Sequence, residues 1–388
     1  MRQPVSILLR SLFSIACLTT ALAPGAAGAG RANDPVKTGR HAAPSADKVF
    51  SKAYIKSTMV KVTQWQLNNP KHAPTDWTNG AFYAGVVAAY QTTKSPLILD
   101  SLMALGQRTG WKPGRRYDHA DDIAISQTYI DLYRLKKDKA MIQPTIDTVQ
   151  RMRTVPGREV RKNGIIWWWC DALFMAPPTL VKLGVTLNDP AYFQTNDLLF
   201  RETYERLYNK TEHLYARDAN YLVNAQGEGK KESNGKLIFW SRGNGWVMGG
   251  LVRLLSELPK NHATRDFYLT NYKEMAERVV SLQQADGLWR ASLLDPEAYP
   301  GGEGSGSGFF CYALAWGINQ GILDKATYQP VVRKAWEGLN TLVSAEGRVG
   351  WVQPIGADPR RNFSAESWEV YGTGAYLLAG SEVIKIKW

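Results

Sequence analysis

The sequence predicts an all-α protein in which six helical hairpins close into a double ring, an (α/α)6 toroid. Strand-like alternation is scarce, and most periodic segments place apolar residues at i, i+3, i+4 and i+7, the spacing of an amphipathic helix. In addition, six segments begin with a polar or glycine-rich turn and continue as an apolar helix rich in small residues. An open helical solenoid is the alternative, but the uneven spacing of the segments, 45 to 71 residues, favours the closed ring.

The six repeated segments define the inner helices of the predicted ring. Each interval between them holds a further amphipathic helix with a charged face, for example at 266–283 and 328–343. Small residues let inner helices pack closely, whereas charged faces belong on the outside. The turns before the inner helices then meet at one mouth of the ring. These turns lie near Asp76, Asp121, Asp171, Arg242, Gly306 and Val370.

The N-terminus has the three parts of a signal peptide. A basic region with Arg2 and Arg10 precedes the apolar run 12–23, and Ala27 and Ala29 form an A-x-A cleavage pattern. The run is too short for a membrane span, which needs roughly 20 residues. We therefore expect export to the periplasm or beyond.

The predicted cleavage site divides the chain into three segments. Residues 1–29 form the signal peptide, 30–48 a flexible lead-in, and 49–388 a single (α/α)6 domain. Cys17 within the apolar run leaves a lipoprotein as the alternative, but Ser14 stands where a lipobox usually has leucine.

Composition points to an anionic sugar as the partner. The formal charge is +12 and falls to +10 without Arg2 and Arg10, which favours anionic partners. Basic residues are scattered and no nucleic-acid module is present, so nucleic acid is not expected. The 14 Trp and 18 Tyr suit the apolar faces of sugars. Cys170 and Cys311 are interpreted as buried free thiols, and no Cys/His cluster has metal-ligand spacing, so no metal is expected.

The six turns bring together carboxylates, an arginine and several tryptophans. Carboxylates transfer protons, rings stack on sugars, and arginine binds carboxylates through two parallel hydrogen bonds. The set comprises Asp76, Trp77, Asn79, Asp121, Asp122, Trp169, Asp171, Trp240, Arg242, Asn244, Trp246, Glu303, Ser305 and Ser307.

Asp171 is the strongest candidate for acid chemistry. It follows three tryptophans at 167–169, and loss of hydration there should raise its pKa into the range of a general acid. The alternative is an N-cap of the next helix.

The adjacent pair Asp121 and Asp122 is the second acidic site. One of the two could cap a helix while the other points into the mouth. Alternatively, one is a cap and the other a charge that faces solvent, and neither takes part in the reaction. Arg242 lies between Trp240 and Trp246, which favours a binding role over a surface turn.

The glycine-rich run 301–308 is interpreted as a flexible turn that shapes the mouth. It lacks the G-K-[ST] ending of a phosphate-binding loop. The polar stretch 218–236 is interpreted as a long exposed loop.

From about residue 51 to 388, the chain resembles the unsaturated glucuronyl and rhamnogalacturonyl hydrolases of glycoside hydrolase families 88 and 105, family 105 most closely. Two motifs carry the resemblance, Trp-Cys-Asp-Ala-Leu-Phe-Met-Ala-Pro at 169–177 and Trp-Ser-Arg-Gly-Asn-Gly-Trp at 240–246. Supporting matches lie at 121–123, 305–308 and 369–374. The resemblance implies an (α/α)6 barrel without a metal or organic cofactor.

The resemblance also implies an unusual hydrolysis. Lyases leave a C4=C5 double bond on the terminal uronate of an oligosaccharide, and these hydrolases hydrate that enol ether so that the unsaturated sugar leaves. The resemblance implies that Asp171 is the acid/base and Asp121 the second carboxylate. The sequence alone does not distinguish Asp121 from Asp122 in this role. Arg242 and Trp246 line the substrate subsite. We further expect substrate contacts from Trp240, Trp169, Trp77, Asp122, Arg217 and Ser305.

Two departures from the family pattern concern histidines. One family histidine falls where this chain has Arg217 or Asp218, and another has no counterpart near Glu159. Both affect substrate preference rather than the reaction. Three alternatives remain: a conventional glycosidase with two carboxylates, a polysaccharide lyase on the same toroid, and a glycan-binding protein without turnover.

Overall fold

The computed structural model describes residues 48–154 and 164–388, all within one compact unit that spans 43–388. The predicted signal peptide, 1–29, the lead-in up to 47 and the region of Glu159 lie outside the described residues. Along the described part, no helix has both the length and the hydropathy that a membrane span requires.

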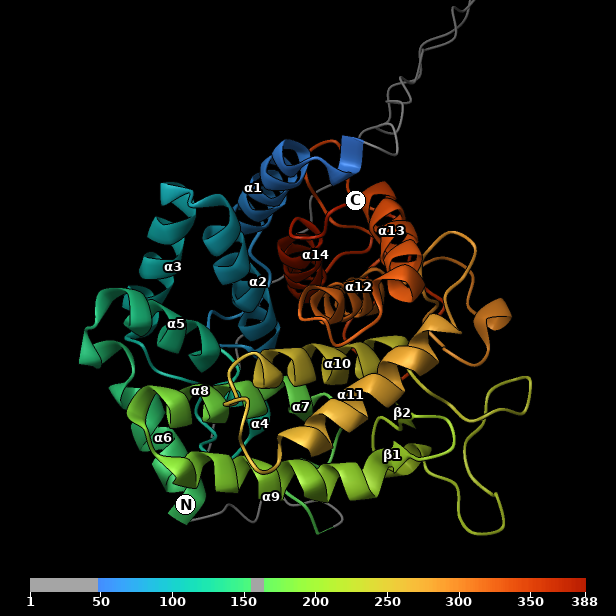
Figure 1. Cartoon of the computed structure of the whole chain (residues 1–388), viewed down its shortest axis with the longest axis horizontal. Coiled ribbons are helices and arrows are strands. Elements are labelled where there is room, and N and C mark those ends of the chain that lie inside the picture. The colour runs from blue at the N-terminus through green and yellow to red at the C-terminus, as the bar shows by residue number, and fades with distance from the viewer. Residues whose placement is uncertain (1–47, 155–163) are drawn as a thin grey trace, which may run out of the picture. The chain divides into compact units, whose positions relative to one another are not determined.

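The described residues form the predicted double ring of helices (Figure 1). Each inner helix packs against the next, and α14 packs against α2, which closes the ring. The inner helices are α2 (Trp77–Thr93), α5 (Ser126–Lys136), α8 (Pro177–Leu187), α10 (Ser241–Leu255), α12 (Gly304–Asn319) and α14 (Val370–Val383). The outer helices are α1 (Lys52–Asn68), α3 (Pro96–Thr109), α6 (Gln143–Thr154), α9 (Pro190–Leu207), α11 (Arg265–Val280) and α13 (Lys325–Thr341).

Small residues explain how closely the inner helices approach one another. Every residue of α10 and α14 is buried. Where α2 crosses α14, a Cβ on Gly85 would lie 2.5 Å from the carbonyl oxygen of Gly374. A side chain at this crossing would force the two backbones apart, so glycine is required there.

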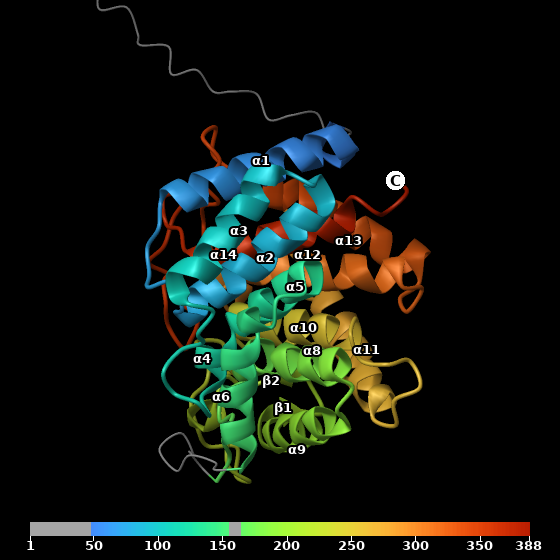
Figure 2. The ribbon, with the colours of Figure 1, turned by 90° about the vertical axis from the view of Figure 1, so that its left-hand side faces the viewer.

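The outer helices are amphipathic and several begin at a side-chain cap. Asp189 accepts a hydrogen bond from the backbone N–H of Ala191 at the start of α9, and Asp324 accepts one from Thr327 in α13. Figure 2 shows α1 and α9 at opposite edges of the double ring. The segments predicted at 266–283 and 328–343 correspond to α11 and α13, so the predicted fold is confirmed.

Short elements complete the described chain. Two one-turn helices, α4 (Ala120–Ile123) and α7 (Ala172–Met175), precede α5 and α8. The strands β1 (Tyr208–Asn209) and β2 (Leu214–Tyr215) pair antiparallel. The 3-10 turns are η1 (Lys48–Phe50), η2 (Lys139–Met141), η3 (Ala219–Tyr221) and η4 (Pro296–Ala298).

The prediction of a flexible glycine-rich turn at 301–308 is wrong for its second half. Residues 304–308 form the buried first turn of α12. The carboxylate of Glu303 accepts hydrogen bonds from the backbone N–H of Gly306 at 2.6 Å and of Ser305 at 3.3 Å. This N-cap and the surrounding packing select a helix, although glycine composition alone favours a loop.

Candidate active site

The N-terminal ends of the inner helices carry the residues that the sequence placed at the mouth. Asp76 caps α2 by accepting a hydrogen bond from the backbone N–H of Thr78 at 3.0 Å. Asp121 lies in α4, Asp171 directly precedes α7, and Arg242 is in the first turn of α10. The convergence of six turns therefore brings carboxylates and cations into one region.

Asp171 is held as a buried acid rather than as a helix cap. Its backbone is helical and, in the part of the chain that the structure describes, its side chain caps no N–H group. The Cys170 thiol donates a hydrogen bond to Oδ1 at 3.3 Å. The side chain is buried, and burial raises its pKa, although the positive charge of Arg217 opposes that rise. The N-cap interpretation is therefore not supported by the geometry.

Asp121 lies close enough to Asp171 and Arg217 for both charges to act on its pKa. Burial raises the pKa of Asp121 to about 7, and the negative charge of Asp171 is the second cause. The ring of His119 accepts a hydrogen bond from the backbone N–H of Asp121, so His119 is the residue that caps α4. The charge of Asp171 therefore favours the protonated form of Asp121.

Asp122 is oriented differently from its neighbour. Its Oδ1 accepts hydrogen bonds from the Arg116 guanidinium, at 2.9 Å from Nε, and its Oδ2 accepts one from the backbone N–H of Arg116 at 2.8 Å. The expectation that one of the two aspartates caps a helix is therefore wrong. Instead, Asp122 fixes the preceding loop, and Asp121 is the member of the pair that interacts with Asp171.

Arg217 is the cation that most strongly lowers the pKa of Asp171. It is the first charge that opposes the rise in the pKa of Asp171, ahead of Arg242. Its guanidinium donates to Asp218 at 2.7 Å and lies over the Trp168 ring. Its side chain keeps 18% exposure. The backbone of the segment is fixed as well, because the Arg217 carbonyl accepts a hydrogen bond from the Cys170 N–H at 2.8 Å.

Arg242 is more enclosed than the sequence indicated. It is fully buried between the Trp240 and Tyr371 rings, 4.4 and 4.7 Å from their centroids. Its terminal nitrogens donate to the carbonyls of Gln353 and Pro354. The positive charge of Arg242 therefore lowers the pKa of Asp171, and its two terminal nitrogens hold the 353–354 segment.

The tryptophans divide into a buried set and an accessible one. Trp246 has no exposed surface and packs on Phe174 and Phe309. Trp240 and Trp169 are 2% and 3% exposed. Trp77 is only partly buried, stacks on Tyr371 at 5.5 Å and meets Trp246 edge-on at 6.0 Å. Of the predicted rings, Trp77 is therefore the best placed to stack on a sugar.

Ser305 lies beneath the mouth rather than on its surface. It is fully buried, and its hydroxyl donates to the Glu303 carboxylate, 2.7 Å from Oε1. The same carboxylate accepts from the backbone N–H of Gln353 at 3.1 Å. Ser305 thus supports the segment that holds Arg242. The binding roles predicted for Ser305, Trp246 and the other turn residues stay predictions.

Tyr371 and Gln353 belong to the site although neither was among its predicted residues. Tyr371 donates a hydrogen bond to the Gln353 carbonyl at 2.7 Å and forms one wall of the Arg242 site. Tyr371 lies in the segment 369–374, whose match to the family could have identified it as a site residue. Gln353 had no such signal, because its role comes from a loop between α13 and α14 whose position depends on tertiary packing.

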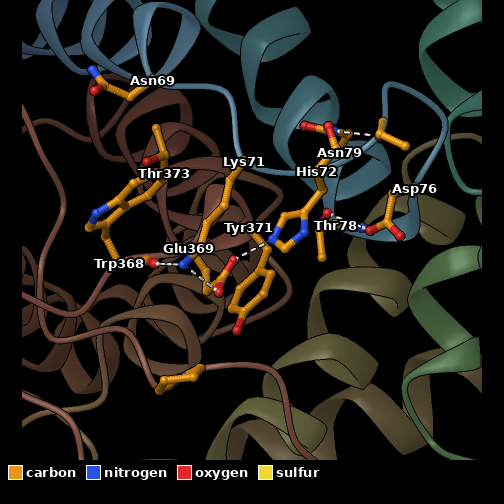
Figure 3. Close-up of polar contacts among 12 residues, drawn as sticks. Asn69, Lys71, His72, Asp76, Thr78, Asn79, Trp368, Glu369, Tyr371 and Thr373 are labelled. Atoms are coloured by element: carbon orange, nitrogen blue, oxygen red, sulfur yellow. Dashed lines mark hydrogen bonds and ion pairs between the residues drawn. The ribbon is translucent and has the colours of Figure 1, made fainter. Parts of the chain in front are cut away.

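An ion-pair clip joins the first hairpin to the last beside the mouth (Figure 3). Glu369, at the start of α14, accepts hydrogen bonds at 2.7 Å from both Lys71 and the His72 ring. Glu369 is 4% exposed. The clip fixes the loop before Trp77 against the α14 turn that carries Tyr371, which positions the two stacked rings.

The two cysteines of the described residues are not arranged for redox or metal chemistry. Cys170 and Cys311 are free and buried, as predicted. Within the described ranges, no group of three or more His, Cys, Asp or Glu side chains is arranged to hold a metal ion.

Comparisons with known proteins agree with this geometry. The model of glycosyl hydrolase family 88 matches residues 50–387. An unsaturated 3S-rhamnoglycuronyl hydrolase of Formosa agariphila is 43% identical over 353 residues, 88% of this chain and 93% of the relative. A solved family 88 hydrolase from Bacteroides vulgatus is 29% identical, with a TM-score of 0.79, and the match covers 87% of this chain and all of that one. A solved polysaccharide lyase is 33% identical, with the same TM-score of 0.79, over 86% of this chain and 97% of that one.

Proposed function

The chain belongs to glycosyl hydrolase family 88 and is a glycoside hydrolase, and on that premise we propose how its site removes a 4,5-unsaturated uronic acid from the non-reducing end of an oligosaccharide. The observation that carries the proposal is the buried Asp171, whose raised pKa and neighbour Asp121 give the mouth a carboxylic acid near neutral pH.

The reaction needs one proton and one water molecule. The carboxyl of Asp171 donates its proton to C4 of the enol ether, and positive charge develops at C5. Water adds at C5 and returns a proton to the Asp171 carboxylate, so the acid is regenerated. The resulting hemiketal opens, the bond to the leaving sugar breaks, and no net proton is consumed.

We propose that substrate binding moves a proton from Asp121 to Asp171. In the free site, Arg217 favours the ionised form of Asp171, while Asp121 keeps its proton up to about pH 7. An incoming uronate carboxylate brings a negative charge and engages the partly exposed Arg217. Both changes raise the pKa of Asp171. The Cys170 thiol, whose own pKa burial raises, remains a neutral donor that orients the carboxyl.

Recognition of the sugar combines charge and stacking. Arg217 is the cation with accessible surface beside Asp171, and its fork suits a carboxylate. Trp77, held on Tyr371, supplies an aromatic face for the ring. The relative from Formosa agariphila acts on an unsaturated rhamnoglycuronyl substrate by its name, which supports a rhamnose-linked uronate here. Export through the N-terminal signal peptide is part of the same proposal and fits an extracellular oligosaccharide.

Loss of ultraviolet absorbance tests the proposal directly. The conjugated C4=C5 bond of an unsaturated rhamnoglycuronyl disaccharide absorbs near 235 nm, and hydration destroys it. We expect wild-type protein to remove this absorbance and Asp171→Asn to be slower by about 10³-fold or more, since the acid is lost. Persistent absorbance with the wild-type protein on unsaturated oligouronides, or near-full activity of Asp171→Asn, would refute the assignment.

A polysaccharide lyase is the second candidate, and the 33% identical solved lyase supports it. A lyase removes the C5 proton of an intact uronate and creates the double bond. With an intact polymer as substrate, absorbance near 235 nm would then rise. The raised pKa values at Asp171 and Asp121 favour the hydrolase, because a lyase needs a base at C5 rather than a protonated acid.

A further inference from the structure

The ring has a second opening, at the end opposite the catalytic mouth. Here the C-terminal halves of the inner helices surround a pocket of about 710 Å³. Each inner helix contributes to its wall, and none of the residues predicted for catalysis lines it. Representative lining residues are Ala88, Asp131, Lys182, Arg253, Tyr312 and Glu382.

The acidic side chains of this rear pocket are already neutralised. Lys182 contacts both Asp131 and Glu257, the latter at 3.1 Å. Arg134 donates two hydrogen bonds of 2.9 Å to the Glu257 carboxylate. In a separate pair, Lys385 contacts Glu382 at 2.5 Å. These pairs leave no carboxylate of the pocket without a cation.

Arg253 is the exception, because it is a buried cation that lacks an acidic partner among the described residues. It is 9% exposed, and its Nε donates to the neutral Gln127 amide oxygen at 2.6 Å. Among the described residues, its buried Nη2 has no hydrogen-bond partner. An unneutralised guanidinium in such a place is unfavourable, and an anion in the pocket would remove that cost.

We propose that the rear pocket binds a small oxyanion, a carboxylate or a sulfate, with Arg253 as its principal ligand. The guanidinium fork matches the planar pair of oxygens that such a group presents. The volume falls in the range of small-molecule sites and admits an ion carried on a single sugar. Tyr312 and Trp316 supply the aromatic wall.

Arg253 is the buried cation that is free to bind the occupant, whereas Lys52 and Lys56, which also line the pocket, are exposed on α1. The C-termini of the inner helices point toward this end and carry partial negative charge, which disfavours an anion except beside an unpaired cation. Lys182 and Arg134 are engaged with acids, so Arg253 alone offers an unpaired buried donor in the described pocket. The site is separate from the proposed hydrolysis and does not depend on it.

The first test is anion-dependent thermal stability. Sodium sulfate is titrated into the wild-type protein, Arg253→Met, Arg253→Lys and two controls, with sodium chloride at matched ionic strength. Arg217→Met removes the cation of the catalytic mouth, and Arg206→Met removes an exposed arginine on α9. We expect sulfate to raise the Tm of wild type and both controls. The apparent Kd should weaken at least tenfold in Arg253→Met. An unchanged sulfate response in Arg253→Met overturns the proposal.

A second measurement covers the case in which Arg253→Met does not fold. Crystals of the wild-type protein are soaked in sodium selenate, and anomalous scattering locates the anion. A peak within hydrogen-bond reach of Arg253 supports the proposal, and a rear pocket without a peak overturns it. Titration with sodium glucuronate alongside sulfate then separates a sugar acid, which would bind more tightly, from an inorganic ion.

Discussion

Asp121 is predicted to be needed for hydrolysis but to lower the stability of the folded protein at high pH. The folded protein keeps the proton on Asp121 up to about pH 7, whereas the unfolded chain releases it near 3.8. Folding therefore becomes less favourable as the pH rises through that window, and the full cost is present above it. Asp121→Asn carries no ionisable group, so it removes the cost.

The magnitude follows from the size of the shift. A change from 3.8 to about 7 corresponds to about 4 kcal/mol, at about 1.36 kcal/mol for each pH unit. The side chain is 19% exposed, so solvent screening reduces this little. We expect Asp121→Asn to be more stable than wild type by about 2 to 4 kcal/mol at pH 8 and by almost nothing at pH 4. Hydrolysis should fall by at least 10²-fold.

Urea unfolding at pH 4, 6 and 8, followed by tryptophan fluorescence, measures the difference. Asp122→Asn is the matched control, because it makes the same chemical change one residue away but breaks the Arg116 ion pair. The control should lose stability at pH 8. A stability difference between Asp121→Asn and wild type that does not change with pH would refute the reasoning.

Further variants test other parts of the site. Arg217→Met should lower kcat/KM by about tenfold to a hundredfold through loss of a charge-assisted hydrogen bond, and should shift the alkaline limb of the pH profile to higher pH, because Arg217 holds down the pKa of the acid Asp171. Cys170→Ala should shift that limb in the same direction with a smaller loss of kcat, since the thiol hydrogen bond also lowers the pKa. Glu369→Gln should cost about 1.5 to 3 kcal/mol in unfolding experiments and raise KM, because the clip beside Trp77 opens. Gly85→Ala should lower Tm by several degrees, since its Cβ would lie 2.5 Å from the Gly374 carbonyl oxygen.

The fold could be predicted because its signal is local and repeated. Each inner helix combines a polar turn with small apolar residues, and these features are visible along the sequence at Asp76, Asp171 and Arg242. The structure places the corresponding helices within a few residues of those positions. Element boundaries failed where a glycine-rich segment formed a helix, since the Glu303 cap and buried packing outweigh propensity there.

The sequence predicts which residues meet at the site but not which partner each side chain contacts. Asp121 and Asp122 are adjacent, and only the tertiary position of Arg116 directs one toward a loop and leaves the other beside Asp171. The same limit applies to arginine. Arg242 lies in the more specific motif, yet loop 353–354 occupies its fork, while Arg217 keeps exposed surface. Sequence motifs identify residues that meet at a site, but the partners of each side chain come from distant segments.

The interaction between the two carboxyls can be measured with a double-mutant cycle. The charge of Asp171 contributes to the raised pKa of Asp121, so Asp171→Asn should lower that pKa toward the value set by burial and the remaining charges. The stabilisation gained from Asp121→Asn at pH 8 should therefore be smaller in the Asp171→Asn background than in wild type. Equal gains in the two backgrounds would mean that the two carboxyls do not interact. The proposed transfer of a proton from Asp121 to Asp171 on substrate binding requires that interaction, so it would be refuted even if both residues were needed for activity.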